Sequence, residues 1–111
     1  MIEQTVLDFL KNTLEVPVYP EEPETPQKEY VLIEKTGSGS ENYINRATFA
    51  IQSFSVSMYQ AAELNEKVKK AMEKIVELDE VCKCSLNSDY DYTDTARKKY
   101  RYQAVFDLVH Y

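Results

Sequence analysis

The chain has 111 residues, a hydrophobic content of 43% and a net charge of −6. Its length suits one small domain spanning residues 1–111, and its hydrophobic content excludes a disordered chain. No apolar run is long enough to span a membrane, and the acidic balance argues against specific binding of nucleic acid.

The first segment, residues 2–14, has apolar side chains at helical spacing, and the helix has to end before Pro17. It lacks the basic start and unbroken apolar stretch of a secretory signal, so we expect a cytoplasmic protein. All four prolines of the chain lie in residues 17–26. Because proline removes a donor from a strand, this region predicts only a short edge strand at residues 16–19 and an acidic, extended connection.

Residues 30–36, "YVLIEKT", are rich in β-formers on both faces and predict a central strand covered on both sides. The next six residues, "GSGSEN", contain both glycines of the chain. Concentrated backbone freedom is typical of an exposed loop that carries function. We therefore expect residues 37–42 to be mobile in the free protein and ordered on assembly.

Residues 46–57 return as a strand whose alternation shifts by one position after Ile51. Such a shift predicts a bulge or the end of the strand near Gln52 and Ser53. Ser57 and Gln60 then have the spacing of a helix capping box, with Val56 placed to pack on Ala61. A helix is expected to begin at about Met58.

This second helix carries one continuous apolar stripe, which predicts that it packs on the core of the domain. The stripe consists of Ala61, Leu64, Val68, Ala71, Met72 and Ile75. On the other face, Glu63 with Lys67 and Glu66 with Lys70 are spaced for ion pairs that indicate a solvated surface.

After the helix the spacing returns to two and predicts a long hairpin, with a turn in residues 93–97 and a last strand running to the end of the chain. The first strand of this hairpin is expected to point Cys82, Cys84, Leu86, Tyr90 and Tyr92 to one face. Together the elements predict an α+β domain: a mainly antiparallel sheet of four to five strands with two helices packed on one face.

No residue pattern indicates catalysis. His110 is the only histidine, and with Cys82 and Cys84 it makes three ligands, which do not close a structural zinc site. The acidic run at Asp89 and Asp91 lacks the glycine and the terminal glutamate of a calcium loop. No serine has a neighbouring base. We expect no enzyme, no catalytic residue, no cofactor and no metal.

Tyrosine is the unusual residue, with nine copies and no tryptophan. Four tyrosines lie near the turn of the last hairpin beside basic residues, and this composition is typical of protein interfaces, although cross-strand aromatic pairing explains part of it. A basic tip on an acidic body could meet the acidic surface of a second copy. The candidate assembly residues are Gly37, Ser38, Gly39, Ser40, Tyr92, Arg97, Lys98, Lys99, Tyr100 and Arg101.

The segments "YVLIEKTGSG", "ATFAIQSFSVSMYQAAELNEKVKKAM" and "RYQAVFDLVHY" together resemble the tail completion or tail terminator proteins of long-tailed bacteriophages and prophages. The resemblance covers nearly the whole chain and lies in the order of its elements. It implies a ring, commonly hexameric, that caps the tail tube and takes part in head-tail joining, with tail-tube and head-tail connector proteins as partners. It also implies a place in the host cytoplasm during assembly and in the virion tail afterwards.

Two alternatives stay open. A small monomeric adaptor or regulatory domain could use the Tyr/Arg hairpin to bind another protein, and a small enzyme of unrecognised type is the third possibility. Mass in solution and the neighbouring genes separate these functions.

Overall fold

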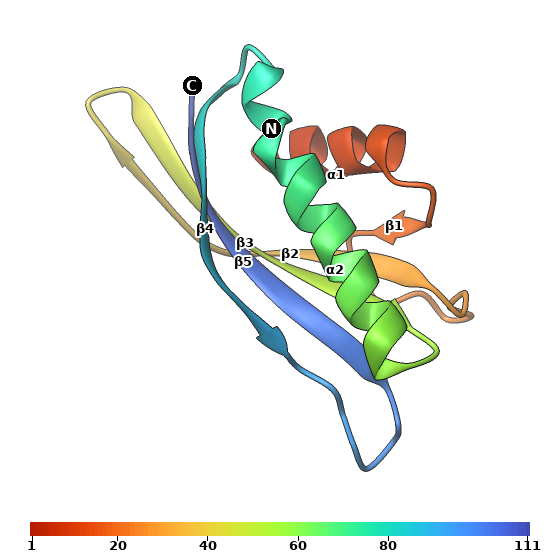
Figure 1. Cartoon of the computed structure of the whole chain (residues 1–111). Coiled ribbons are helices and arrows are strands. Elements are labelled where there is room, and N and C mark those ends of the chain that lie inside the picture. Colours follow the sequence, from red (N-terminus) through yellow and green to blue (C-terminus); the bar gives the residue numbers. More distant parts are fainter.

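The computed structural model describes residues 1–111 and confirms the α+β prediction. Figure 1 shows a twisted sheet with both helices on one side of it. The elements in chain order are α1 (Ile2–Thr13), β1 (Val18–Tyr19), β2 (Tyr30–Glu41), β3 (Ile44–Ser55), α2 (Met58–Glu73), a short 3-10 helix η1 (Ile75–Glu77), β4 (Val81–Asp91) and β5 (Tyr100–His110). Neither α-helix combines the length and apolar character needed to cross a membrane.

The sheet has five strands in the order β1-β2-β3-β5-β4, and every pairing except β1 with β2 is antiparallel. The short edge strand expected in the proline region is confirmed as β1. The central strand, however, is β3. Strand β2 has neighbours on both sides only at Val31 and Leu32, because β1 pairs with no other residue.

The core lies between the sheet and the two helices and consists of one cluster of 18 buried residues. Both helices contribute apolar side chains to it, and every residue of the predicted α2 stripe is buried. Its fully buried members include Val6, Leu10, Phe49, Ile51, Val68, Met72 and Ile75. This single cluster joins the sheet and both helices into one packed unit.

The start of α2 is confirmed. Ser57 has an extended backbone, and its hydroxyl oxygen accepts a hydrogen bond from the backbone N–H of Gln60 at 3.2 Å, as a helix N-cap does. Val56 does not complete the expected staple, since it is 52% exposed whereas Ala61 is fully buried.

The expected loop at residues 37–42 is wrong. Strand β2 continues through Gly37, Ser38, Gly39 and Ser40 to Glu41, because each of these residues pairs with β3. The chain reverses in two residues, Asn42 and Tyr43, with φ angles of 51° and 67°. Two positive φ angles match the twist of a tight hairpin.

Of the two alternatives expected near Gln52 and Ser53, the bulge is wrong, and β3 ends two residues further on, at Ser55. Both registers of β3 run unbroken through Gln52 and Ser53, and the irregularity in this hairpin lies in β2, between Lys35 and Gly37. The alternation changes because both faces of β3 are covered there. Phe54 points away from the helices and stacks on Tyr30, with ring centroids 4.4 Å apart.

Strand β4 contains two register shifts, between Val81 and Lys83 and between Leu86 and Ser88. The second shift reverses the alternation. Leu86 pairs with the core residue Phe106, but Tyr90 pairs with Gln103, which faces away from the helices. The prediction that the tyrosines share a face with Cys84 and Leu86 is therefore wrong.

The predicted ion pairs of Lys67 and Lys70 on α2 are not formed in the structure. Lys69 instead contacts Glu66 at 2.7 Å and Asp89 at 2.9 Å. Asn65 also donates a hydrogen bond to Asp89, at 3.0 Å. These contacts attach α2 to β4 and leave the other lysines of the helix unpaired.

Truncation of the α2 stripe tests the core. We expect Leu64→Ala and Val68→Ala each to lower the free energy of unfolding by about 2 kcal/mol or more, because both side chains are buried and leave a cavity. The measurement is urea denaturation. The matched control Lys74→Ala changes an exposed side chain at the C-cap of the same helix and should stay within about 0.5 kcal/mol of wild type.

Candidate functional site

The turn of the β4–β5 hairpin is closed by Asp94. Asp94 and Lys99 exchange two backbone hydrogen bonds of 3.0 Å each, and the Asp94 carboxylate accepts the backbone N–H of Arg97 at 3.3 Å. Lys98 occupies the left-handed region with φ of 53°. The basic segment is thus a turn whose backbone is closed by hydrogen bonds.

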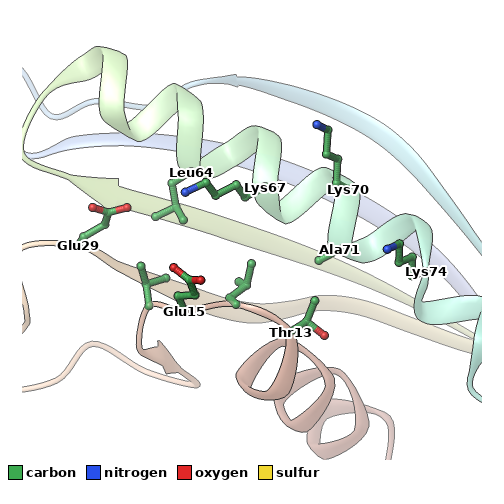
Figure 2. Close-up of a pocket in the computed structure, with 10 residues that line it drawn as sticks. Thr13, Glu15, Glu29, Leu64, Lys67, Lys70, Ala71 and Lys74 are labelled. Atoms are coloured by element: carbon green, nitrogen blue, oxygen red, sulfur yellow. The ribbon is translucent and has the colours of Figure 1, made fainter.

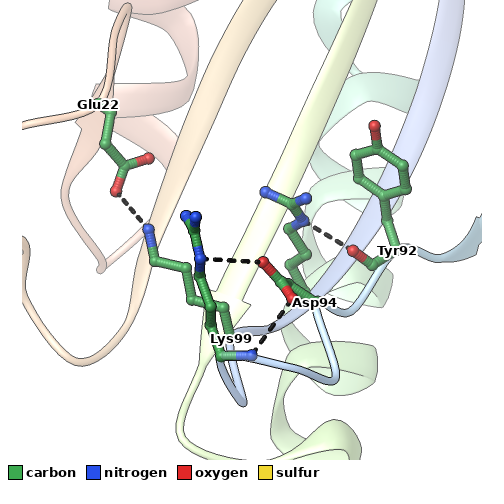
Figure 3. A network of polar contacts seen from close by, with 6 residues as sticks. Glu22, Tyr92, Asp94 and Lys99 are labelled. Carbon is green, nitrogen blue, oxygen red and sulfur yellow. Dashed lines mark hydrogen bonds and ion pairs between the residues drawn. The ribbon is translucent and has the colours of Figure 1, made fainter.

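Arg101 is held on the face of the sheet opposite the helices. Its Nε atom donates to the backbone carbonyl of Tyr92 at 2.7 Å, and its guanidinium lies 4.4 Å from the Tyr92 ring centroid and 5.6 Å from that of Phe54. Figure 3 shows the bond to Tyr92 beside the contacts of Asp94. Cation–π contacts of this kind fix the side chain against the strand.

Lys99 joins the hairpin tip to the proline-rich connection. Its ammonium lies 3.1 Å from Glu22 (Figure 3). It also lies 5.5 Å above the Phe54 ring, and the same Glu22 oxygen accepts the Tyr30 hydroxyl at 2.6 Å. Partial burial opposes ionisation of Glu22, but the hydrogen bonds from Tyr30 and Lys99 lower its pKa overall. Burial, followed by the bond to Glu22, raises the pKa of Tyr30.

These contacts divide the predicted basic residues into two groups. Lys99 and Arg101 are bound within the chain, whereas Lys98 is exposed and makes no ion pair. The Arg97 side chain is 83% exposed and lies 3.8 Å from Asp94. Lys98 is therefore the unpaired charge of the tip, and Arg97 is largely exposed although it forms a long ion pair with Asp94.

The predicted tyrosines also divide. Tyr92 is 44% exposed and contacts Tyr90 edge to face on the side away from the helices. Tyr100 is half-buried and has the alternation of the core residues of β5. Tyr92 thus remains available to a partner, and Tyr100 is mostly structural.

The two parts of the predicted assembly surface lie at opposite ends of the molecule. The β3–β5 register pairs Ser55 with Tyr100 near the basic tip, and it pairs Asn45 with His110 near the end that carries Gly37 to Ser40 (Figure 1). We call this second end the β2–β3 arm, residues 37–46. The structure does not bring the arm and the basic tip together into one site.

The arm has an exposed apolar tip that sequence reasoning missed. Tyr43 is 98% exposed and Ile44 is 43% exposed. Glu41 pairs directly with Ile44, and Arg46 lies two residues further along β3, so the three side chains share one face of the hairpin. Neither Glu41 nor Arg46 forms an ion pair in the structure.

A groove between the end of α1 and α2 was also missed (Figure 2). Its volume is about 620 Å³, within the usual range for binding clefts. The groove is lined by Thr13, Leu14, Glu15, Val16, Glu29, Leu64, Lys67, Lys70, Ala71 and Lys74. Its floor is apolar, one wall carries lysines of α2, and the other carries the two glutamates.

A signal for this groove existed in the sequence. Lys67, Lys70 and Lys74 are spaced three and four apart, which puts them on one side of a helix. Because Lys67 and Lys70 were interpreted as ion-pair partners of glutamates on the same helix, the row of three lysines was not recognised as one wall of a groove. The facing glutamates could not be found from spacing, because tertiary packing brings them there.

Away from the helices, the sheet surface is joined by polar side chains. The Thr48 hydroxyl and the Asn87 amide both donate to Asp107 at 2.9 Å. Gln52 donates to Gln103 at 3.1 Å, and Gln103 donates to the Tyr90 hydroxyl at 2.5 Å. This face is therefore hydrogen-bonded across three strands and offers no large apolar patch.

The reactive side chains are scattered. Burial, and then the nearby Asp107, raises the pKa of the Cys84 thiol to about 11, which keeps it protonated near neutral pH. His110 pairs with Val81, and its Nδ1 atom contacts the Tyr111 carbonyl. No group of three or more His, Cys, Asp or Glu side chains is placed to hold a metal ion.

No protein-family model matches the chain, and no curated protein matches it. The function has to be inferred from the surfaces themselves: a basic tip, a projecting arm and a charged groove.

The Glu22 contacts predict an acid-sensitive connection. Because the folded-state pKa of Glu22 is lowered, its stabilising contribution is present above the unfolded pKa of about 4.5 and is lost as the pH falls through the folded value. We expect the stability difference between wild type and Glu22→Gln to be largest near pH 6 and to shrink below about pH 4.5. Urea denaturation at several pH values measures it. Glu24→Gln, a neighbouring glutamate without an ion pair, should show no such change with pH.

Proposed function

We propose that the protein is a structural subunit of a phage or prophage tail that caps the tail tube as a ring and takes part in head-tail joining. This function needs a rigid body that contacts neighbours on different sides. The observation that carries the proposal is the β3–β5 pair, which ends at the arm on one side and at the basic tip on the other. Unlike surfaces at opposite ends suit head-to-tail contacts, which close into rings.

The distribution of charge supports contacts with acidic partners. Arg97 and Lys98 project from a chain whose net charge is −6, so the tip is attracted to the acidic surface of a neighbouring copy or tail protein. An acidic body also favours a channel that DNA passes without sticking. Tyr92 beside the tip adds a residue type that is enriched at interfaces.

The groove favours the alternative, a monomeric adaptor that binds a peptide of another protein. It has an apolar floor, charged walls and the volume of a binding cleft. The two functions differ in stoichiometry. An adaptor binds as one copy to one partner, whereas a terminator assembles in several copies on the end of a tube.

The double variant Arg97→Glu, Lys98→Glu tests the proposal. Lys99 is left unchanged because losing its bond to Glu22 would make the monomer less stable. Exposed substitutions should shift unfolding by only about 0.5 kcal/mol each, but like charges at an interface should abolish capping. The readout is electron microscopy of tail tubes, formed from the tail-tube protein of the same genome, with and without the chain.

Wild type is expected to appear as a cap at tube ends, and salt should weaken this capping. Lys83→Glu, a single charge reversal of the same kind on β4, serves as the control for charge placed away from the tip. Bare tube ends with the wild-type protein, or one-to-one binding of a soluble partner, would contradict the proposed function.

A further inference from the structure

We propose that the tip of the β2–β3 arm docks into the groove between α1 and α2 of a second copy of this chain. The inference rests on the proposed ring and names the contact that would build it. The arm and the groove lie in different parts of the molecule, so one chain cannot close this contact on itself (Figure 1). The contact is head to tail, and repetition of it around an axis gives a ring.

The apolar parts of the two surfaces match. Tyr43 and Ile44 are exposed at the arm tip of the single chain. The groove offers an apolar floor that includes Leu14, Val16 and Ala71. Burial of an aromatic anchor in a pocket on a partner is the usual centre of a protein interface.

The charges match as well. Glu41 and Arg46 are diagonal neighbours on one face of the arm, with their Cβ atoms separated by about 7–8 Å in such geometry, and Ile44 lies between them. The groove also carries both signs of charge, on opposite walls. Lys67 and Lys74 lie on the α2 wall, and Glu15 and Glu29 lie on the other wall. Figure 2 shows Lys67 extending over the groove toward the side of Glu29.

The matching orientation places Glu41 against the lysine wall and Arg46 against the glutamate wall. All of these side chains except the partly covered Glu29 are exposed in the single chain, and none forms an ion pair there. Charges that are free in the monomer and complementary between copies fix the direction of docking.

The backbone of the arm tip provides an independent observation. Tyr43 has φ of 67°, in the left-handed region that favours glycine, and the second position of this tight turn is the usual place for glycine. A large side chain held there, and 98% exposed, is unfavourable for folding of the single chain. A backbone outlier of this kind points to a function for the side chain.

Pairing between sheet edges is a weaker explanation of assembly. The outer edge of β4 is interrupted by two register shifts and the open edge of β2 by one, and such bulges protect an edge from pairing with another strand. A contact between the arm tip and the groove does not depend on strand pairing, so these bulges do not prevent it.

Sedimentation velocity of the full chain over a range of concentrations tests the contact. Tyr43→Gly should raise the melting temperature of the monomer or leave it unchanged, yet weaken self-association by about 10-fold or more. Glu41→Lys and Lys67→Glu should each weaken association by a similar factor. The double variant Glu41→Lys, Lys67→Glu should return to within about threefold of wild type, because it restores opposite charges.

Each outcome has a definite reading. If association is unchanged in Tyr43→Gly and in both single reversals, this contact is overturned, but the ring proposal stands. If the double variant fails to recover association, the same conclusion follows. A wild-type chain that stays monomeric at millimolar concentration also overturns the contact. Association through tip and groove that leaves tail-tube ends bare supports the contact and contradicts the proposed function. Lys83→Glu should associate as wild type does.

Discussion

The antiparallel pairing of β3 with β5 is the constraint on which the rest of the structure depends. It runs without a break from Asn45 with His110 to Ser55 with Tyr100. Each strand also belongs to a hairpin, β3 with β2 and β5 with β4, and the two hairpins turn at opposite ends of the pair. The helices cover one face of this pair through a single core. A shift of one residue would expose Phe49, Ile51 and Phe106 and move both ends.

Partial covering of the second face explains why β3 is buried on both sides near its end. Tyr30 and Phe54 stack there, and Lys99 and Arg101 lie over the Phe54 ring. Glu22 then connects this cluster to the proline-rich segment. Lys99 and Arg101, which the sequence pattern assigns to an exposed basic tip, thus stabilise the fold, and only Lys98 is left without an ion pair.

The sequence predicted the helices, the edge strand and the last hairpin because their signals are local. The α2 stripe, Ser57 as N-cap and the prolines each act within a few residues. The errors arose where a distant segment decides. Glycine-rich residues 37–41 form a strand because β3 supplies their partners, and β3 needs no bulge because Tyr30 covers Phe54. The two bulges of β4 could not be predicted, because the spacing of its apolar residues continues unchanged past them.

The candidate surfaces were predicted in part. Tyrosine and arginine near the last turn marked one end, and both glycines marked the arm, although for the wrong reason. Tyr43 and Ile44 were missed because two apolar residues in a short turn carry no periodicity. The groove was missed because it joins Glu15 and Glu29 to a helix far along the chain. The spacing of residues in the sequence predicts only the row of lysines, whereas the glutamates that face it are brought there by tertiary packing.

Closure explains how modest contacts of this kind could build a stable assembly. A tip of two apolar side chains and two charges is small beside the interface of a permanent dimer, so a single contact between two copies should be weak. A ring has one more contact than an open chain of the same number of subunits, and that last contact forms within the assembly at high effective concentration. Association should therefore be cooperative, with few intermediate oligomers between monomer and ring. In the proposed ring, the direction that Glu41 and Arg46 give to the contact would matter more than the strength of either charge, because a contact with the wrong rotation would give open filaments.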